Sequence, residues 1–282
     1  MREHNEYYGN GSRRGLRQRC FDRLKRLGAN SHVVRVSPPS QSSRDFRGHA
    51  RLGDYADAGA MVAAFKGIDR VLFVSTPQPD IQQNVVQAAK TNHVSYIAYT
   101  SIYAPDLPQF GLEISHRQTE QWLRDSGLHY TILRNAWYTR VQQGLINLAA
   151  KTHQLPYFSG DGVISSALRR EYAEAGARVI VAATASPIVT LAGKPYTYPE
   201  LGTAIGTALG APVTSTAVSE TETKAQLTQA GVDATLVGMA VAYQDYTRKG
   251  QNGEAAADPT EFERILGHPL TPLAAAVKEL LP

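Results

Sequence analysis

The sequence predicts an α/β protein with a doubly wound parallel sheet and a smaller α/β lobe toward the C-terminus. Short apolar, β-branched runs recur between residues 70 and 134, helical patterns of apolar residues separate them, and each run ends in hydroxyl or amide side chains. Strands alternating with helices at this spacing imply right-handed crossovers between parallel strands. Ligands bind such sheets at the carboxyl ends of the strands, so we expect the functional site there.

The elements of the first half follow in order from residue 51. Met61, Val62 and Phe65 have helical spacing, and Gly67 behind them suits the end of a helix. The run from Arg70 to Thr76 is typical of a buried parallel strand that ends in a loop. The same patterns predict helices over 57–66, 81–91 and 113–126 and strands over 70–76, 94–101 and 130–134.

After residue 138 the alternation of strands and helices becomes less regular. We place there the boundary between the first domain and a smaller lobe over 139–282, which is partly interleaved with it. This lobe is predicted to hold a helix over 172–183, two strands around a turn at 192–194, and a helix over 197–209. A small α/β segment over 212–247, a polar loop over 251–259 and short helices up to residue 281 complete the chain.

Composition excludes several classes of protein. Cys20 is the sole cysteine, so no disulfide forms within the chain, and an inert thiol is favoured over a nucleophile because no partner is evident. No apolar run reaches the eighteen or so residues of a transmembrane helix, and the first residues lack the apolar core of a secretory signal. We therefore expect a cytoplasmic protein without a membrane partner. No metal site is expected.

The net charge of +4 is unevenly placed, because arginines and lysines crowd the first 26 residues. Such a basic arm is one way to bind nucleic acid. It carries few aromatic residues and matches no nucleic-acid-binding module, so we expect no nucleic-acid partner. Salt-dependent binding that is lost on deletion of the arm would indicate the alternative.

Four segments resemble the NmrA-like branch of atypical short-chain dehydrogenases, and most nearly its bacterial NAD(P)H:quinone oxidoreductases. They are RLGDYAD from Arg51, AYTS from Ala98, HRQTEQWLRDSGLHYTILRNAWY from His116 and LGHPLTPL from Leu266. The resemblance runs from Arg51 to the C-terminus, and its Arg-Asn-x-Trp-Tyr segment is fairly specific. It implies a Rossmann-like, NAD(P)-binding first domain and a substrate-side second lobe.

The resemblance also implies site residues. The adenine ring is expected beside Asp54 and Tyr55, and the nicotinamide near Thr100 and Ser101. Asn135, Trp137 and Tyr138 are expected to line the pocket for a flat quinone, with core packing as the alternative for the two aromatic residues. The residues expected along the ribose and pyrophosphate are Ser75, Thr76, Pro77 and Gln78.

The Tyr-x-x-x-Lys pair of ordinary short-chain dehydrogenases is absent, and the corresponding helix shows His116-x-x-x-Glu120 instead. Alcohol oxidation needs a positioned base, whereas quinone reduction needs mainly hydride delivery with protons available from water. The departure therefore favours a quinone-like acceptor. His116 is a candidate proton donor; the alternative is a solvated histidine on the helix surface.

The family begins with an apolar strand and a glycine-rich loop whose amides hold the pyrophosphate. Gly9, Gly11 and Gly15 are present at the wrong spacing, and the apolar strand is missing. The reading frame can be shifted so that each new codon takes the last two bases of one residue's codon and the first base of the next. In that frame, residues 5–21 can encode MSIMVTGAAGALGSAVL. The same shift from Arg35 onward restores a strand that ends in arginine. We therefore hypothesise that parts of residues 1–50 are frame-shifted. If residues 1–50 are instead produced as the sequence gives them, we expect impaired cofactor binding.

The sequence thus predicts an NAD(P)H-dependent oxidoreductase that reduces a quinone-like acceptor by hydride transfer. NADP(H) is the expected cofactor, with NAD(H) as the alternative, because the arginine that favours the phosphate belongs to the shifted frame. A non-catalytic NAD(P)-sensing regulator is the second candidate. The physiological acceptor and the oligomeric state do not follow from the sequence.

Overall fold

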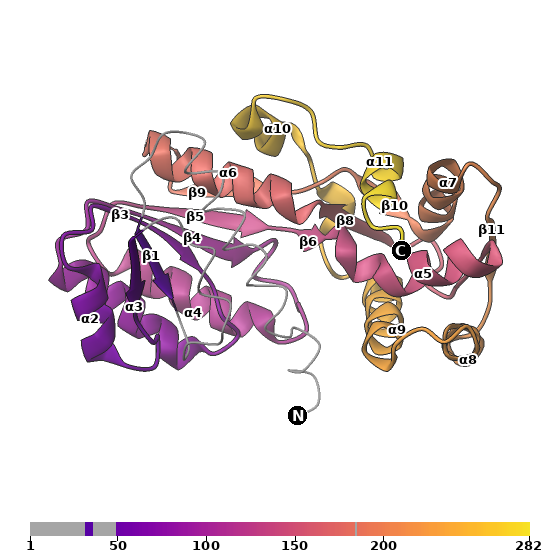
Figure 1. Ribbon diagram of the computed structural model, residues 1–282, viewed down its shortest axis with the longest axis horizontal. Coiled ribbons are helices and arrows are strands. Elements are labelled where there is room, and N and C mark those ends of the chain that lie inside the picture. The colour runs from indigo at the N-terminus through magenta and orange to yellow at the C-terminus, as the bar shows by residue number, and fades with distance from the viewer. Residues whose placement is uncertain (1–31, 36–48, 184) are drawn as a thin grey trace. The chain divides into compact units, whose positions relative to one another are not determined.

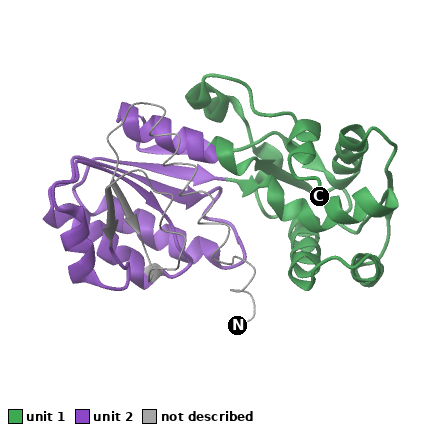
Figure 2. Cartoon of the chain, in the orientation of Figure 1, with its two compact units in different colours: residues 1–9, 136–171, 191–282 green, residues 10–135, 172–190 purple. Residues whose placement is uncertain are grey.

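The computed structural model describes residues 32–35, 49–183 and 185–282, and these residues form two compact units (Figure 2). Unit 2 contains the described residues up to Asn135 together with Tyr172–Thr190. Unit 1 contains Ala136–Glu171 and Leu191–Pro282. The chain therefore leaves unit 2 after Asn135 and returns to it once. The division at residue 138 into cofactor and substrate domains stays a prediction.

Unit 2 is built on a sheet with the strand order β3 (Arg70–Val74), β4 (Tyr96–Ile102), β5 (Tyr130–Asn135) and β9 (Ile188–Leu191). The first three strands are parallel, and their register aligns Val74 with Thr100 and Thr100 with Leu133. The carboxyl ends of β3, β4 and β5 consequently lie at one edge. The predicted α/β fold with parallel strands is confirmed.

Helices cover both faces of this sheet, with α2 (Ala58–Phe65), α3 (Pro79–Thr91) and α4 (Leu112–Arg124) on one face and α6 (Arg169–Ala182) on the other (Figure 1). The helix predicted over 57–66 forms as α2, because the Asp57 side chain accepts a hydrogen bond from the Ala60 amide at 2.9 Å. Gly67 follows α2 with a φ of 72°, as its predicted place at the helix end requires.

The core of unit 2 forms between the strands and the first helices. Phe73, Tyr99 and Ile132 are adjacent in the register and almost fully buried on one face. On the opposite face, a Cβ at Gly176 of α6 would lie 3.4 Å from Leu72. Side chains therefore alternate between the two faces, as a sheet covered on both sides requires.

Two further strands, β1 (His32–Arg35) and β2 (His49–Leu52), form a separate parallel pair. The strand expected near residue 32 is thus present. The glycines at 9, 11 and 15, Cys20, the basic arm and the segment 5–21 lie outside the described residues.

Unit 1 has two small sheets. One has the order β10 (Pro195–Thr197), β8 (Val163–Ala167) and β6 (Trp137–Tyr138), and the other pairs β11 (Thr214–Ala217) with β7 (Gln154–Tyr157). The longer helices of unit 1 are α5 (Gln143–Thr152), α7 (Tyr198–Leu209), α8 (Glu220–Gln229) and α9 (Ala234–Lys249). The short ones are η3 (Thr139–Gln142), η4 (Glu254–Ala256), α10 (Thr260–Leu266) and α11 (Leu273–Lys278).

The helix predicted from residue 197 begins at a capping box, in which Thr197 and Glu200 satisfy each other's backbone amides. No helix within the described residues is both long and apolar enough to cross a membrane.

Candidate functional site

The carboxyl ends of β3 and β4 bring two predicted cofactor residues into contact. The Ser75 amide donates a hydrogen bond to Thr100 Oγ1 at 3.0 Å, and the two hydroxyl oxygens lie 3.3 Å apart. The contact follows from the parallel register, in which Val74 pairs with Thr100. Residues 25 positions apart in the sequence therefore form one polar surface at the sheet edge.

The next residue, Thr76, is held through its backbone by two helices. Its amide donates to Gln82 Oε1 at 3.0 Å, and its carbonyl accepts from the Ser115 hydroxyl at 3.3 Å. Gln82 is fully buried in α3, and its Nε2 donates to Ser115 Oγ at 2.9 Å and to Thr119 Oγ1 at 3.0 Å. The loop after β3 is therefore fixed in place by side chains of α3 and α4.

Of the other residues predicted around the cofactor, Pro77 and Gln78 follow directly in this loop and Tyr55 contacts β3. Gln78 is exposed at the start of α3, and its carbonyl accepts from the Thr76 hydroxyl at 3.2 Å, with Pro77 between them. Tyr55 is buried against Phe73, and its hydroxyl lies 3.4 Å from the carbonyl oxygen of Val74. Asp54 is exposed and forms a turn with the amide of Ala56. Tyr55 therefore also belongs to the core.

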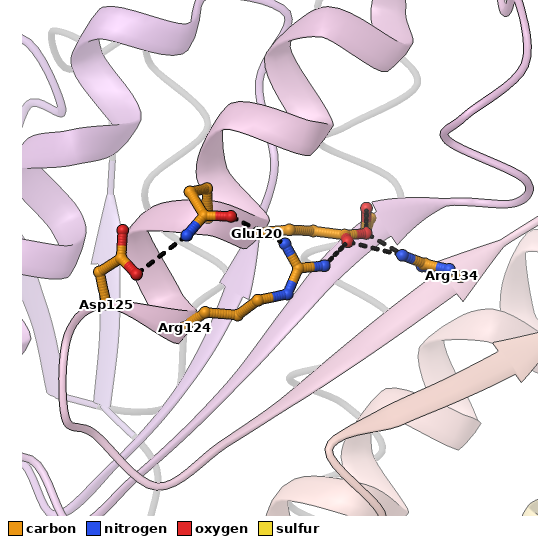
Figure 3. A network of polar contacts seen from close by, with 6 residues as sticks. Glu120, Arg124, Asp125 and Arg134 are labelled. Atoms are coloured by element: carbon orange, nitrogen blue, oxygen red, sulfur yellow. Dashed lines mark hydrogen bonds and ion pairs between the residues drawn. The ribbon is translucent and has the colours of Figure 1, made fainter.

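Ser101 lies near the end of β4 and contacts the buried carboxylate of Glu120. Figure 3 shows the charged network around this carboxylate. Its hydroxyl donates to Glu120 Oε1 of α4 at 2.7 Å. Arg134 of β5 donates to both oxygens of the same carboxylate, from Nε at 3.1 Å and from Nη2 at 2.8 Å. Arg124 donates to Glu120 Oε2 at 2.7 Å. The side chain of Glu120 is 1% exposed.

The surroundings of Glu120 decide its charge. Burial alone would raise its pKa, but the hydrogen bonds from Arg134 and Ser101 and the charges of Arg134 and Arg124 outweigh burial, so the pKa lies below the ordinary glutamate value. Glu120 is therefore an anion at neutral pH. It lies four residues after His116, the spacing that separates the tyrosine and the lysine of the Tyr-x-x-x-Lys pattern.

His116 is buried in α4 rather than solvated on its surface, which corrects the alternative interpretation from the sequence. Its Nδ1 lies 3.1 Å from the hydroxyl of Tyr99. Burial raises the pKa of Tyr99, so this hydroxyl keeps its proton. His116, Ser115, Thr119 and Glu120 lie on the buried side of α4, where they contact β4, β5 and the loop after β3.

Asn135 ends β5, and its side-chain oxygen is buried without a hydrogen-bond partner among the described residues. A buried carbonyl oxygen without a donor is costly, so its presence at the strand edge favours a ligand that donates an N–H or O–H. Its backbone carbonyl is already satisfied by the Tyr103 amide at 2.8 Å.

In unit 1, Trp137 belongs to a buried aromatic cluster. Its ring meets the rings of Tyr243 and Tyr246 edge-on, with centroids 5.0 and 5.7 Å away. Tyr138 is half-buried, with the Arg169 guanidinium 5.5 Å from its ring centre. Core packing accounts for the burial of Trp137, and the substrate role of both residues stays a prediction.

Glu254 is a buried carboxyl group that the sequence did not single out. It accepts hydrogen bonds from the Trp137 indole at 2.5 Å, the Tyr246 hydroxyl at 2.9 Å and the Ser165 amide. Burial raises its pKa to about 7, although these three hydrogen bonds oppose the shift. Glu254 lies in a segment predicted to be a polar loop, and nothing in that pattern indicates burial.

Gln82 is another buried polar residue that was not predicted, although its position in the sequence indicates its role. It shares a helix face with Val85 and Ala89, which are both buried. A polar residue on an apolar face indicates a buried hydrogen-bonding role.

The family profile described as NAD(P)H-binding matches residues 23–168. Quinone oxidoreductase 2 of Escherichia coli (strain K12) is 34% identical over 236 residues, which cover 82% of each chain. The chain belongs to the NAD(P)H-binding family. An NmrA-like family domain-containing oxidoreductase of Aspergillus flavus is 28% identical over 188 residues, covering 62% of this chain and 61% of the relative. These matches confirm the resemblance to NmrA-like oxidoreductases.

Among solved structures, the chain is similar to an NADPH-dependent quinone oxidoreductase from Escherichia coli that was crystallised with NADPH. The two have a TM-score of 0.80 and 30% sequence identity, over 96% of this chain and 98% of the other. The Rossmann-like fold and the NADP(H) class of cofactor are thereby confirmed.

The described residues fit this cofactor class. The unpartnered oxygen of Asn135 suits an amide N–H, and the hydroxyl groups of Ser75 and Thr100 suit a ligand rich in hydroxyl and phosphate oxygens. The segment 5–21, where a glycine-rich loop for the pyrophosphate is expected in the shifted frame, lies outside the described residues.

Proposed function

We propose that the chain reduces a quinone-like acceptor with NAD(P)H by direct hydride transfer. The nicotinamide supplies the hydride when the cofactor is bound. The residues that we propose to hold the cofactor are Asp54, Tyr55, Ser75, Thr76, Pro77, Gln78, Thr100 and Ser101. Asn135, Trp137 and Tyr138 are the proposed substrate residues.

The protonation states of Glu120 in α4 and Tyr99 in β4 support this acceptor class. Glu120 is an anion held by two guanidinium groups, and Tyr99 keeps its proton because burial raises its pKa. Glu120 is a poor base, because its pKa is lowered and both of its oxygens already accept hydrogen bonds from Ser101 and the two arginines. Tyr99 does not ionise, so neither group suits the acid–base step that alcohol oxidation requires. A quinone accepts a hydride and can take its proton from water. The similarity to quinone oxidoreductase 2 supports the same class.

Oxidation of NADPH in the presence of a small benzoquinone tests this proposal. We expect turnover with the quinone and none with simple secondary alcohols and NADP⁺. Tight NADPH binding without turnover of any quinone would instead indicate the NAD(P)-sensing regulator.

We also propose that the reading frame is shifted in parts of residues 1–50. The family profile begins to match at residue 23, directly after the segment 5–21 in which the shifted frame would restore the glycine-rich loop. Sequencing the genomic DNA across this region tests the proposal. An unambiguous frame that encodes the present residues would reject it.

A further inference from the structure

The hydrogen bond between Ser101 and Glu120 has a fixed direction, with the serine as donor and the carboxylate as acceptor. The Ser101 hydroxyl carries a single hydrogen, which it gives to Glu120 Oε1 at 2.7 Å. An ionised carboxylate has no hydrogen to return. Any further group that binds Ser101 Oγ must therefore donate a hydrogen bond to it.

Arg134 fixes the direction of this contact. Its two parallel N–H groups bind both oxygens of Glu120 (Figure 3). Arg134 also pairs with Ser101 across the β4–β5 register, so the three residues lie together in unit 2. Two-point binding by a guanidinium holds a carboxylate in a defined plane. With Arg124 donating to Oε2, each oxygen of Glu120 has more than one donor.

We propose that Glu120, held by Arg134, is a positioning residue that presents Ser101 to the cofactor as a hydrogen-bond acceptor. The ligand group of matching chemistry is one that donates N–H, such as the carboxamide of a nicotinamide ring. Ser101 is then no proton donor to the acceptor, whose protons come from solvent. The inference rests on the proposed binding of NAD(P)H at this sheet edge.

A thermodynamic cycle on NADPH affinity tests the proposal, with Ser101→Ala, Glu120→Gln and the double variant measured by nicotinamide fluorescence in the full chain. The same set is made with residues 5–21 replaced by the shifted-frame string. We expect each single variant to weaken binding about three- to tenfold, the worth of one hydrogen bond. The double variant should be no weaker than the weaker single variant, because both remove the same contact.

Glu174→Gln is the matched control. Glu174 also pairs with an arginine, Arg178 at 2.9 Å, but within α6. The Glu174→Gln substitution should leave the dissociation constant for NADPH within about twofold of that of the unsubstituted chain. If Glu120→Gln does not fold, Arg134→Lys replaces it, since lysine keeps the charge but loses the two parallel donors. Its effect should likewise vanish in the Ser101→Ala background.

Three results would overturn the proposal. One is a double variant whose fold-loss of NADPH affinity equals the product of the losses in the two single variants. Another is a Ser101→Ala variant that binds NADPH normally but has a much lower kcat, which would make Ser101 a proton donor. The third is the absence of NADPH binding in both forms of the chain. If binding behaves as expected and no quinone is reduced, the proposed function fails while this inference stands.

Discussion

The indole N–H of Trp137 donates a hydrogen bond of 2.5 Å to the carboxyl group of Glu254, which is almost fully buried in unit 1. This contact ties β6 to η4 across 117 positions of sequence. Burial raises the pKa of Glu254 to about 7 although this hydrogen bond lowers it, so the stability of unit 1 should depend on pH.

The stability of unit 1 should fall as the pH rises from about 5 to above 7. The folded state then holds a proton that the unfolded state, with an ordinary glutamate pKa of 4.5, has already lost. A shift to about 7 corresponds to a loss of roughly 3 kcal/mol by pH 8. Urea unfolding at pH 5 and pH 8 measures this loss, and Glu254→Gln should remove most of it. An equal pH dependence in both proteins would reject a raised pKa.

Gln82→Met should destabilise unit 2 and weaken NADPH binding, because it leaves the amide of Thr76 without its acceptor. An unsatisfied buried amide costs about 1–3 kcal/mol in the free energy of unfolding. Gln83→Met is the matched control, since Gln83 is exposed on the same helix. Denaturant unfolding and NADPH titration check both effects. Equal behaviour of the two variants would show that Gln82 does not anchor the loop.

Gly144→Ala should destabilise unit 1, because a Cβ there would lie 2.7 Å from the carbonyl oxygen of Leu236 in α9. Forcing two packed helices apart costs about 1–3 kcal/mol. Gly59→Ala in α2 meets its nearest atom at 3.4 Å and should be neutral or stabilising, since alanine favours helices. Thermal unfolding of both variants distinguishes close helix packing from a general effect of the methyl group.

His116→Gln separates two sources of the proton. If water supplies it, kcat for quinone reduction should stay within about threefold, whereas a general acid contributes about 10²–10⁴-fold. Steady-state rates between pH 6 and 9 measure the effect. A loss beyond a hundredfold, with a changed pH profile, would make His116 the proton donor.

The sequence predicted the sheet and the strand ends well, because both depend on local patterns. The apolar runs before Ser75 and Thr100 specify buried parallel strands, and the register then brings the two hydroxyl groups together. The helix boundaries at Asp57 and Thr197 follow from capping side chains next to them in sequence.

The buried polar partners could not be predicted in the same way. Glu120 and Arg124 have the spacing of an exposed ion pair on a helix, and only the packing of α4 on β5 supplies Arg134 and removes the carboxylate from water. Glu254 is buried by residues far along the chain, such as Trp137 and Ser165. Such positions depend on tertiary contacts that no local pattern encodes.

We propose that NAD(P)H lies along the carboxyl ends of β3, β4 and β5. A crystal structure of the full chain with NADPH, in the reading frame that the genomic DNA establishes, would locate the cofactor. We expect the cofactor to contact the loop after β3, with its nicotinamide amide within hydrogen-bonding distance of Ser101 or Asn135. A cofactor bound elsewhere, or crystals at saturating NADPH that contain none at this edge, would contradict this placement of the cofactor.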